Sequence, residues 1–469
     1  MLTPAAHAAL AAVLGPARLL TGEAMVPFCG DWTGAYTARP AAVAQPGSTA
    51  EVQAVVRIAA DCGLTVVAAG GRTGLVGGCM TEGGLMLSLD RLNTITDLNP
   101  TTRTVTAGAG TILSTLHDAA AEKGLYFPLW FGARGSATLG GALSTNAGGS
   151  NVLRYGSTRA LCLGVEVVLA DGRVLNLMSR LHKDNSGYDL KDLFIGAEGT
   201  LGIITQAVMK LVPAAQAHAT ATLAVRSLAD ALALLHQLQA ATGGLVEAFE
   251  YMSPAYLRRL AEARPDVRQP FAPVAPCTIL VELAATAPRD TEARADGSVP
   301  LTDLLEGALS GMMETGAVLD AEIARTEAQR RAMWQRRELA AEVTFARKPA
   351  IDTDIALPLD RVADFLTAIA ARLPALDAGA EDLSIAHLGD GNIHYTVFPT
   401  RGDIYDAVVS EVEDLVVGMG GSFSAEHGVG LSKRPSMARR KDPVALDVMR
   451  SVKAALDPGN LFNPGKVLP

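Results

Sequence analysis

The sequence has few cysteines, and we expect neither a leader nor a membrane segment in it. Its cysteines, an odd number without a CxxC pair, are Cys29, Cys62, Cys79, Cys162 and Cys277. We expect small buried thiols in a reducing compartment, and hence a cytoplasmic protein. The first 20 residues have no leading positive cluster and no clear cleavage site, which favours a short surface helix over a signal peptide. No run of about 20 uninterrupted apolar residues occurs, so we expect no membrane span.

Charged residues are also scarce. They make up 19% of the chain against 49% hydrophobic residues, which describes a folded globular protein and argues against disorder. The formal net charge is −9 with Lys and Arg scattered along the chain, which argues against nucleic acid as a main partner. A length of 469 residues exceeds the size at which a single core keeps growing, so at least two domains are expected.

The distribution of glycine divides the chain. Residues 41–215 alternate between predicted strands and helices with many glycines, whereas 216–380 are richer in Ala, Leu and charged residues. Glycine motifs return at 387–394 and 425–430. We expect domains at 1–215 and 216–430, with a C-terminal segment, 431–469, that rejoins the first domain. Predicted helices cover 50–61 and about 321–344, predicted strands cover 64–69, 85–89, 104–107, 164–169 and 201–211, and 287–298 is predicted to be a loop.

Two common nucleotide-binding motifs are missing. The chain has no GK[ST] Walker loop and no GxGxxG that opens a helix, which counts against ATP and NAD. Three segments rich in glycine and hydroxyl groups are present instead, at 69–78, 132–149 and 196–205. Glycines lack a Cβ, so backbone N–H groups can surround an anion such as a pyrophosphate. Together the segments suggest a long, extended cofactor lying along the backbone; three unrelated turns are the alternative.

Histidine is scarce, yet three of the eight histidines lie between positions 387 and 427. His387 and His394 are seven residues apart, about 10 Å on a helix, too far to share one metal, and on opposite faces of a continuous strand. A tight turn centred on Asp390-Gly391 would instead pair them across a hairpin, on one face and about 5 Å apart at Cα. The flanking segments 383–386 and 393–398 read as strands. A hairpin that is purely part of the core is the alternative.

A third cluster, Glu426-His427-Gly428, offers a carboxylate and another imidazole. Two nitrogens and one carboxylate leave a coordination position open, which is the pattern of a catalytic divalent metal site. Adjacent residues of an extended chain point apart, so Glu426 and His427 should have different roles.

Several strings together resemble the vanillyl-alcohol-oxidase type of FAD-binding fold, and within it the D-lactate and D-2-hydroxyglutarate dehydrogenase branch. They are GGRTGLVGG (70–78), SATLGGALSTNAGG (136–149), KDNSGYDLKDLFIGAEGTLGIIT (183–205), HLGDGNIHY (387–395), EHGVG (426–430) and LDPGNLFNPGK (456–466). The resemblance runs from about Gly34 to Lys466 and extends to the FAD subunit of glycolate oxidase. It implies an α/β (α+β) fold with a two-lobed FAD-binding domain. A substrate- and metal-binding cap domain would carry an antiparallel sheet with flanking helices.

The resemblance assigns the cofactor site residue by residue. The FAD pyrophosphate would lie on Gly70, Gly71, Arg72, Thr73 and Gly74. Ser136, Thr138, Gly141, Thr145 and Gly149 would line the rest, with Glu198, Gly199, Gly202 and Ile204 near the adenosine half and Lys466 as a further contact. Members with covalent flavin usually carry a histidine after the first glycine loop, where this chain has Leu75. Ser136 stands where a cysteinyl attachment would lie, so we expect non-covalent FAD.

The resemblance also assigns His387, His394 and Glu426 as ligands of a divalent metal, with zinc as first candidate, and His427 as the catalytic base. A metal bound to the substrate's hydroxyl and carboxylate lowers the hydroxyl pKa; for bound water the fall is from 15.7 to about 7. His427 could then take that proton near neutral pH while the C2 hydride passes to flavin N5.

Arg337 and Asn392 are assigned to the substrate. Arg337 lies three residues after Trp334 on one face of a predicted helix and matches the family's Trp-x-x-Arg-Glu pattern. Its planar guanidinium suits a carboxylate, in a charge-assisted bond worth roughly 1.5–3 kcal/mol. A solvated arginine is the alternative.

Two departures bear on the substrate. Ala341 stands where the hydroxyglutarate branch usually has a threonine, and Asp352 where it usually has a lysine. An acid at that point puts a second substrate carboxylate in doubt, although Lys348 is a candidate substitute.

The expected function is FAD-dependent oxidation of a D-2-hydroxy acid to the 2-oxo acid. The electrons would pass to an acceptor other than NAD: an electron-transfer flavoprotein, a quinone or a cytochrome. A homodimer is one expected assembly. The alternatives are the FAD subunit of a glycolate-oxidase-like complex, a flavin-dependent transferase resembling the ether-lipid synthases, and a non-catalytic flavin-binding protein.

Overall fold

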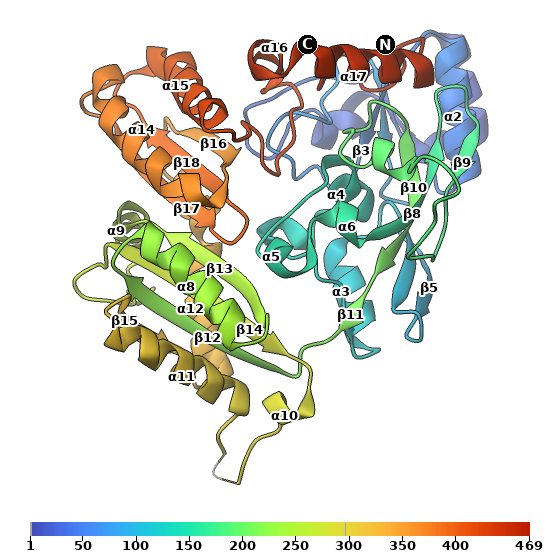
Figure 1. Ribbon diagram of the computed structural model, residues 1–469. Helices are drawn as coiled ribbons and strands as arrows, with labels where there is room; N and C mark the ends of the chain where they lie inside the picture. The colour runs from blue at the N-terminus through green and yellow to red at the C-terminus, as the bar shows by residue number, and fades with distance from the viewer. Residues whose placement is uncertain (1, 296) are drawn as a thin grey trace. The chain divides into compact units, whose positions relative to one another are not determined.

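The computed structural model describes residues 2–295 and 297–469, and the chain forms two compact units (Figure 1). Unit 1 contains the residues up to Gly148 together with 156–213 and 426–469, and unit 2 contains 149–155 and 214–425. The sequence predicts junctions at 215 and 430, whereas the units divide after 213 and 425. Both units mix helices and strands, so the predicted α/β (α+β) class is confirmed.

Unit 1 is built on two main sheets. The first has the order β1 (Leu19–Leu20), β2 (Ala42–Ala44), β4 (Leu85–Ser88), β3 (Val66–Ala69), with β4 parallel to both of its neighbours. The second is antiparallel, in the order β5 (Ile95–Asn99), β6 (Thr104–Gly108), β10 (Ile203–Lys210), β8 (Cys162–Val168), β9 (Val174–Asn176). A short pair joins β7 (Leu125–Tyr126) to β11 (Val212–Pro213).

The helices of unit 1 follow the sequence signals. The predicted helix over 50–61 is α2 (Thr49–Asp61), which begins where the Ser48 hydroxyl accepts the Glu51 N–H. Its apolar residues recur at helical spacing and form one buried face. The other helices of this unit are α1 (Pro4–Leu14), α3 (Leu113–Ala121), α4 (Leu139–Thr145), α6 (Thr158–Leu161), α7 (Lys191–Phe194), α16 (Arg434–Arg440) and α17 (Pro443–Leu456).

The C-terminal segment is part of unit 1. Leu461 accepts the N–H of Val66 through its carbonyl, and the Asn463 N–H donates to the Val66 carbonyl, so the chain end runs beside β3. A buried Asp457 caps this turn by accepting the N–H groups of Leu461 and Phe462.

Unit 2 is built on one antiparallel sheet of seven strands. Its order is β15 (Val318–Ile323), β12 (Ala217–Val225), β14 (Cys277–Ala285), β13 (Val246–Met252), β17 (Glu381–His387), β18 (Asn392–Phe398), β16 (Ile351–Ala356). A short piece from the first half of the chain, with α5 (Val152–Tyr155), belongs to this unit. Arg154 Nη1 donates to the carbonyl oxygen of Ala284 at 2.7 Å and holds the piece on β14.

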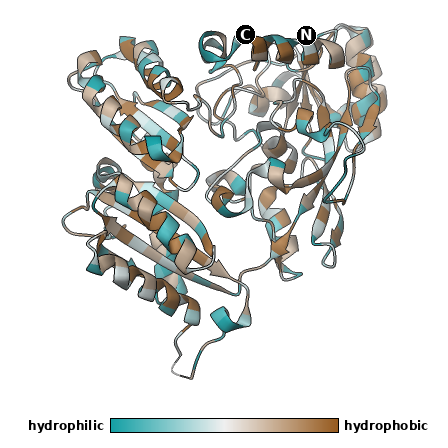
Figure 2. Cartoon of the chain, in the orientation of Figure 1, coloured by the Kyte–Doolittle hydropathy of each residue, from teal (hydrophilic) through white to brown (hydrophobic). Residues whose placement is uncertain are grey.

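The two faces of this sheet differ in chemistry. One face is apolar and packs against α8 (Leu228–Ala241), α11 (Pro300–Glu314), α14 (Val362–Leu376) and α15 (Tyr405–Gly418). The other packs against α9 (Pro254–Ala263), α12 (Glu327–Glu338) and α13 (Ala340–Phe345), and it carries acidic and imidazole groups between its apolar residues. Figure 2 shows both hydrophobic and hydrophilic segments along these helices, as expected for helices with one face on a sheet.

The predicted helix over 321–344 begins later than expected and is divided. Residues 321–323 belong to strand β15, and α12 starts only after Thr326, which forms a reciprocal capping box with Gln329. The expected loop over 287–298 contains the short helix α10 (Pro288–Thr291), and position 296 lies outside the described residues. Among the described residues, no helix is long and apolar enough to cross a membrane.

Candidate active site

In unit 1 the first glycine segment packs against the start of α4. A Cβ on Gly71 would lie 2.0 Å from the carbonyl oxygen of Ser136, and a Cβ on Gly70 would lie 2.3 Å from Thr138 Oγ1. At Gly71 no other residue fits without moving the backbone, whereas at Gly70 the Thr138 side chain would have to move. Thr138 Oγ1 accepts the N–H groups of Gly71 at 3.3 Å and Gly141 at 3.4 Å. Two segments predicted to line the same cofactor therefore form one surface.

The same loop has backbone donors that fit an anion. Arg72 has a φ of 55°, a left-handed turn, and no hydrogen bond of the backbone N–H groups of Arg72, Thr73 and Gly74 is found among the described residues. Successive N–H groups in such a turn make an anion-binding concavity. The Arg72 guanidinium donates to the Pro27 carbonyl and stacks over the Phe28 ring, 4.3 Å from its centroid. The loop thus suits a pyrophosphate through its backbone.

Glu198 holds the segment that follows Glu426 and His427. Its carboxylate accepts the N–H of Val429 at 2.7 Å and the N–H of Gly430 at 2.9 Å. Burial raises the pKa of this carboxyl above its usual value, although the two N–H groups act in the opposite direction. Glu198, expected near the adenosine half of FAD, thus also orders the EHGVG string.

The remaining predicted cofactor residues lie in unit 1, except Gly149, which belongs to unit 2. Gly202 packs so closely that a Cβ there would lie 2.6 Å from Val167 Cγ1. Lys466 is buried, and desolvation lowers the pKa of its amine to about 8. Ile204 is buried in β10, and the Thr145 hydroxyl donates to the Gly141 carbonyl. Gly199 has a positive φ. Gly149 is the first residue of unit 2.

In unit 2 both hairpin histidines lie on the polar face of the sheet. Their ring centroids are 5.6 Å apart and the rings are nearly perpendicular. The predicted pairing of His387 with His394 is wrong: His387 pairs with Asn392, and His394 pairs with Ile385. The reason is a four-residue loop, 388–391, where a two-residue turn is expected. The register shifts by two positions, which keeps both imidazoles on one face.

A buried glutamate that sequence reasoning missed joins His387 to Arg337. Glu250, only 1% exposed, lies opposite His387 in the sheet. Its Oε1 is 2.8 Å from His387 Nδ1, and its Oε2 accepts from Arg337 Nε at 2.8 Å. Burial opposes ionisation, but the imidazole and the guanidinium outweigh it and hold the pKa of Glu250 below its usual value.

Arg337 itself is 8% exposed, and its Nη2 has no hydrogen-bond partner within residues 2–295 and 297–469. A buried guanidinium N–H without an acceptor is costly, which points to an anionic ligand. Helix α12 is held over the polar face at its other end by Glu282. That carboxylate accepts both Arg330 Nη2 and Nε at 2.7 Å and Trp334 Nε1 at 2.9 Å.

Next to His394 lies a second buried carboxylate, which the sequence reasoning also missed. Asp354 is 1% exposed and pairs directly with His394, and their ligand atoms lie within 4.8 Å of each other. Asn392 Nδ2 donates to Asp354 Oδ1 at 3.0 Å, while Asn392 Oδ1 is buried without a partner in the described part of the chain. Imidazole nitrogens and carboxylate oxygens on one buried face suit a divalent transition metal.

Glu426 and His427 directly follow Ala425, which is hydrogen-bonded to the strand that carries Asp354. Ala425, the last residue of unit 2, donates its N–H to the Asp354 carbonyl at 3.3 Å. Glu426 is the next residue, with its Cα about 3.8 Å further on. Within unit 1 the Glu426 carboxylate lies 3.8 Å from His427 Nε2.

The two missed acids have a sequence signal. The strings VEAFEYM (246–252) and IDTDIA (351–356) place acids in strands that are otherwise apolar or hydroxyl-bearing. Acids are rarely buried unless paired, so acids within such strands indicate a polar site on one face.

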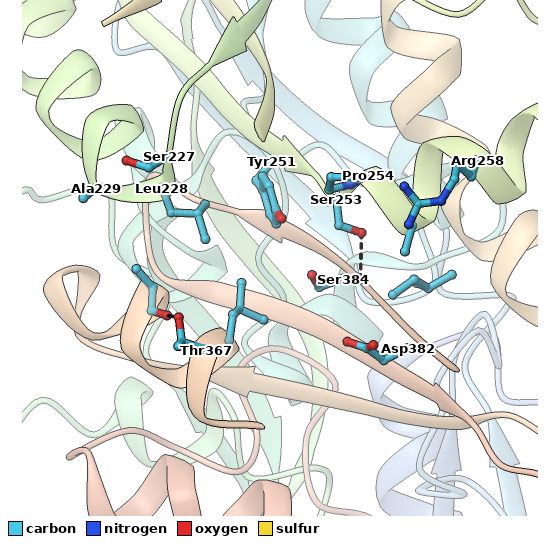
Figure 3. A pocket seen from close by; sticks show the side chains of 14 residues that line it. Ser227, Leu228, Ala229, Tyr251, Ser253, Pro254, Arg258, Thr367, Asp382 and Ser384 are labelled. Carbon is cyan, nitrogen blue, oxygen red and sulfur yellow. Dashed lines mark hydrogen bonds between the residues drawn. The ribbon is translucent and has the colours of Figure 1, made fainter. Parts of the chain in front are cut away.

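A cavity of about 470 Å³ opens elsewhere in unit 2. Figure 3 shows that Tyr251, Ser253, Arg258, Asp382 and Ser384 line it. Tyr251 and Ser384 alternate with Glu250 and His387 along their strands and so point to the opposite face. None of the predicted site residues lines this cavity.

Comparison with known proteins gives two family matches. The C-terminal domain of FAD linked oxidases matches residues 214–467, and an FAD binding domain matches residues 40–178. The chain belongs to the FAD-linked oxidase family. It is 36% identical over 459 residues to a D-2-hydroxyglutarate dehydrogenase of Xanthomonas citri pv. viticola, covering 96% of this chain and 94% of the relative.

Two solved structures have a similar fold. A p-cresol methylhydroxylase structure has a TM-score of 0.75 at 16% identity, covering 98% of this chain and 96% of that chain. An alkyldihydroxyacetonephosphate synthase structure has a TM-score of 0.72 at 17% identity, covering 99% of this chain and 85% of that chain. At these identities the likeness concerns the fold alone.

Proposed function

We propose that this FAD-linked oxidase oxidises a D-2-hydroxy acid to the corresponding 2-oxo acid. The proposal rests on the full-length similarity to D-2-hydroxyglutarate dehydrogenases. The observation that carries it is the buried Nη2 of Arg337, which lacks an acceptor among the described residues on the polar face that also holds His387 and His394. A guanidinium is well suited to the carboxylate that every 2-hydroxy acid carries.

Each residue of the site has a distinct role. Arg337 binds the substrate carboxylate through its Nη end, and Asn392, whose Oδ1 is buried without a partner in the described part of the chain, is the second substrate-binding residue. His427 receives the proton of the C2 hydroxyl. Bound FAD would accept the hydride from C2 and pass the electrons to an acceptor other than NAD.

A divalent metal, with zinc as first candidate, would be held by His387, His394 and Glu426. Asp354, beside His394, is a further oxygen donor: their ligand atoms lie within 4.8 Å of each other, in a group of described residues that does not include His387. When bound, such an ion would polarise the substrate's hydroxyl and carboxylate oxygens. The backbone loop of residues 70–74 and the α4 segment would hold the FAD pyrophosphate without a covalent bond.

The test is a screen of D- and L-2-hydroxy acids with an artificial electron acceptor. We expect turnover of D-acids only. Arg337→Ala should lower kcat/KM by about 10- to 100-fold, the value of a lost charge-assisted hydrogen bond. Arg331→Ala, an exposed arginine of the same helix, should leave kcat/KM unchanged. Absence of D-acid oxidation by the metal- and FAD-loaded protein would contradict the proposal.

Two further features stay predictions. The electron acceptor is expected to be an electron-transfer flavoprotein, a quinone or a cytochrome. A cytoplasmic location is expected from the cysteines, which are all unpaired. Activity of the isolated chain would distinguish a complete dehydrogenase from a subunit of a glycolate-oxidase-like complex.

A further inference from the structure

One buried carboxylate on the polar face contacts two residues with different expected roles. Glu250 comes from the centre of the sheet, His387 from the adjacent strand and Arg337 from a helix that crosses this face. Each of the two carboxylate oxygens takes one partner, at 2.8 Å in both cases. Glu250 is 1% exposed, so water does not compete for these bonds.

These bonds fix how the two side chains are oriented. Because Glu250 contacts His387 Nδ1, a metal on this imidazole would be bound through Nε2. Because Glu250 occupies Arg337 Nε, the guanidinium can meet an anion only with its Nη end, and Nη2 is buried without a partner in the described part of the chain. The carboxylate therefore sets both orientations at once.

We propose that Glu250 is the positioning residue that aligns the metal-binding His387 and the substrate-binding Arg337. This inference rests on the proposed function. Carboxylates behind metal-bound histidines fix the ring and raise its basicity, and their loss commonly costs 10- to 100-fold in metal affinity. Here the Glu250 carboxylate also orients the Arg337 guanidinium toward the substrate. Metal affinity and substrate affinity should therefore both depend on Glu250.

Glu247 provides a matched control. It lies in the same strand, is 5% exposed, and its side chain faces Tyr155 and His218 rather than His387 or Arg337. Replacing Glu247 by Gln therefore makes the same chemical change in the same buried strand without altering the contacts of Glu250 with His387 and Arg337.

The experiment uses the full chain loaded with FAD. Zinc affinity is measured by competition with a chelator, and KM is measured for the best D-2-hydroxy acid of the screen. Glu250→Gln should weaken zinc binding by about 10- to 100-fold and raise KM by about 10-fold or more. Glu247→Gln should leave KM unchanged; it controls KM alone, because Glu247 lies with His218 and Glu282 in a second group of possible metal ligands. In an Arg337→Ala background, Glu250→Gln should still weaken zinc binding but have no further effect on KM.

The outcomes separate the two proposals. Wild-type zinc affinity in a folded Glu250→Gln protein, or an equal rise of KM in Glu247→Gln, would overturn the inference. If Glu250→Gln does not fold, Glu250→Asp carries the test. Its shorter carboxylate keeps the charge but cannot reach both partners, so wild-type zinc affinity together with wild-type KM would overturn the inference. A wild-type protein that oxidises no D-2-hydroxy acid would contradict the proposed function. The zinc measurement would still test whether Glu250 positions His387.

Discussion

The Thr396 hydroxyl donates a hydrogen bond of 2.6 Å to the Asp352 carboxylate, directly across β16 and β18. Asp352 is two residues before Asp354 and therefore lies on the same polar face as His394. Negative charge on this face bears on the size of the substrate.

We expect kcat/KM for D-lactate or another D-2-hydroxy monoacid to equal or exceed that for D-2-hydroxyglutarate. Negative charge at Asp352 near a distal carboxylate should cost about 1–3 kcal/mol of binding, roughly a 5- to 150-fold loss. Asp352→Lys should shift the ratio toward the dicarboxylate, whereas Asp360→Lys, an exposed site in the same unit, should not. A strong wild-type preference for D-2-hydroxyglutarate would show that Lys348 or another base binds the second carboxylate.

The hairpin histidines should be required for metal. His387→Ala or His394→Ala should remove about one equivalent of divalent metal per chain and abolish turnover while FAD stays bound. His236→Ala, on the exposed side of α8, is the control. Elemental analysis that finds no metal in active wild-type enzyme would falsify the metal proposal.

The flavin should be released by acid or heat. Leu75 and Ser136 occupy the positions where the family's covalent attachments would lie, so the yellow colour should appear in the supernatant after precipitation. Flavin that remains with the precipitated polypeptide would show a covalent bond.

Two glycines of the same loop should respond differently to alanine. Gly71→Ala forces a Cβ to within 2.0 Å of a backbone oxygen, and should destabilise the protein by about 1–3 kcal/mol and weaken FAD binding. A Cβ added at Gly74 would have no described atom within 4 Å, so Gly74→Ala should cost much less. Thermal unfolding and flavin content measure both, and equal losses would show that the close contact at Gly71 is not the cause.

Lys466 should make stability depend on pH in the FAD-free protein. Burial lowers its pKa to about 8, against about 10.4 in the unfolded chain. The folded state then binds fewer protons than the unfolded state between these values, so the contribution of Lys466 to stability rises with pH across this window and is least favourable below pH 8. Relative to wild type, Lys466→Met should raise Tm most at pH 7 and least at pH 10. Lys441→Met, an exposed site, should show no such trend.

The sequence predicted local features better than long-range ones. The strands around the hairpin and the face shared by His387 and His394 followed from alternation and from a short turn. The register did not, because an Asp-Gly turn can close a two-residue or a four-residue loop, and the loop here has four residues. Even so, both alternatives preserve the face because they differ by two positions.

Glu250 shows why the rest could not be predicted. It lies 137 residues before His387, and only the order of strands in the sheet brings the two together. Sheet order depends on contacts between distant segments, which periodicity does not report. Likewise, the predicted helix over 321–344 includes residues 321–323, which instead form the end of β15 because they pair with β12.

The inclusion of residues 149–155 in unit 2, and of residues 426–469 in unit 1, has a consequence for synthesis on the ribosome. All residues of unit 2 have been made once the chain reaches Ala425, including the Arg154 that bonds to β14. At that moment unit 1 still lacks the segment that pairs beside β3. The unit encoded mainly in the second half of the gene can therefore complete its fold first, and the nascent flavin-binding half must wait for the last residues to emerge.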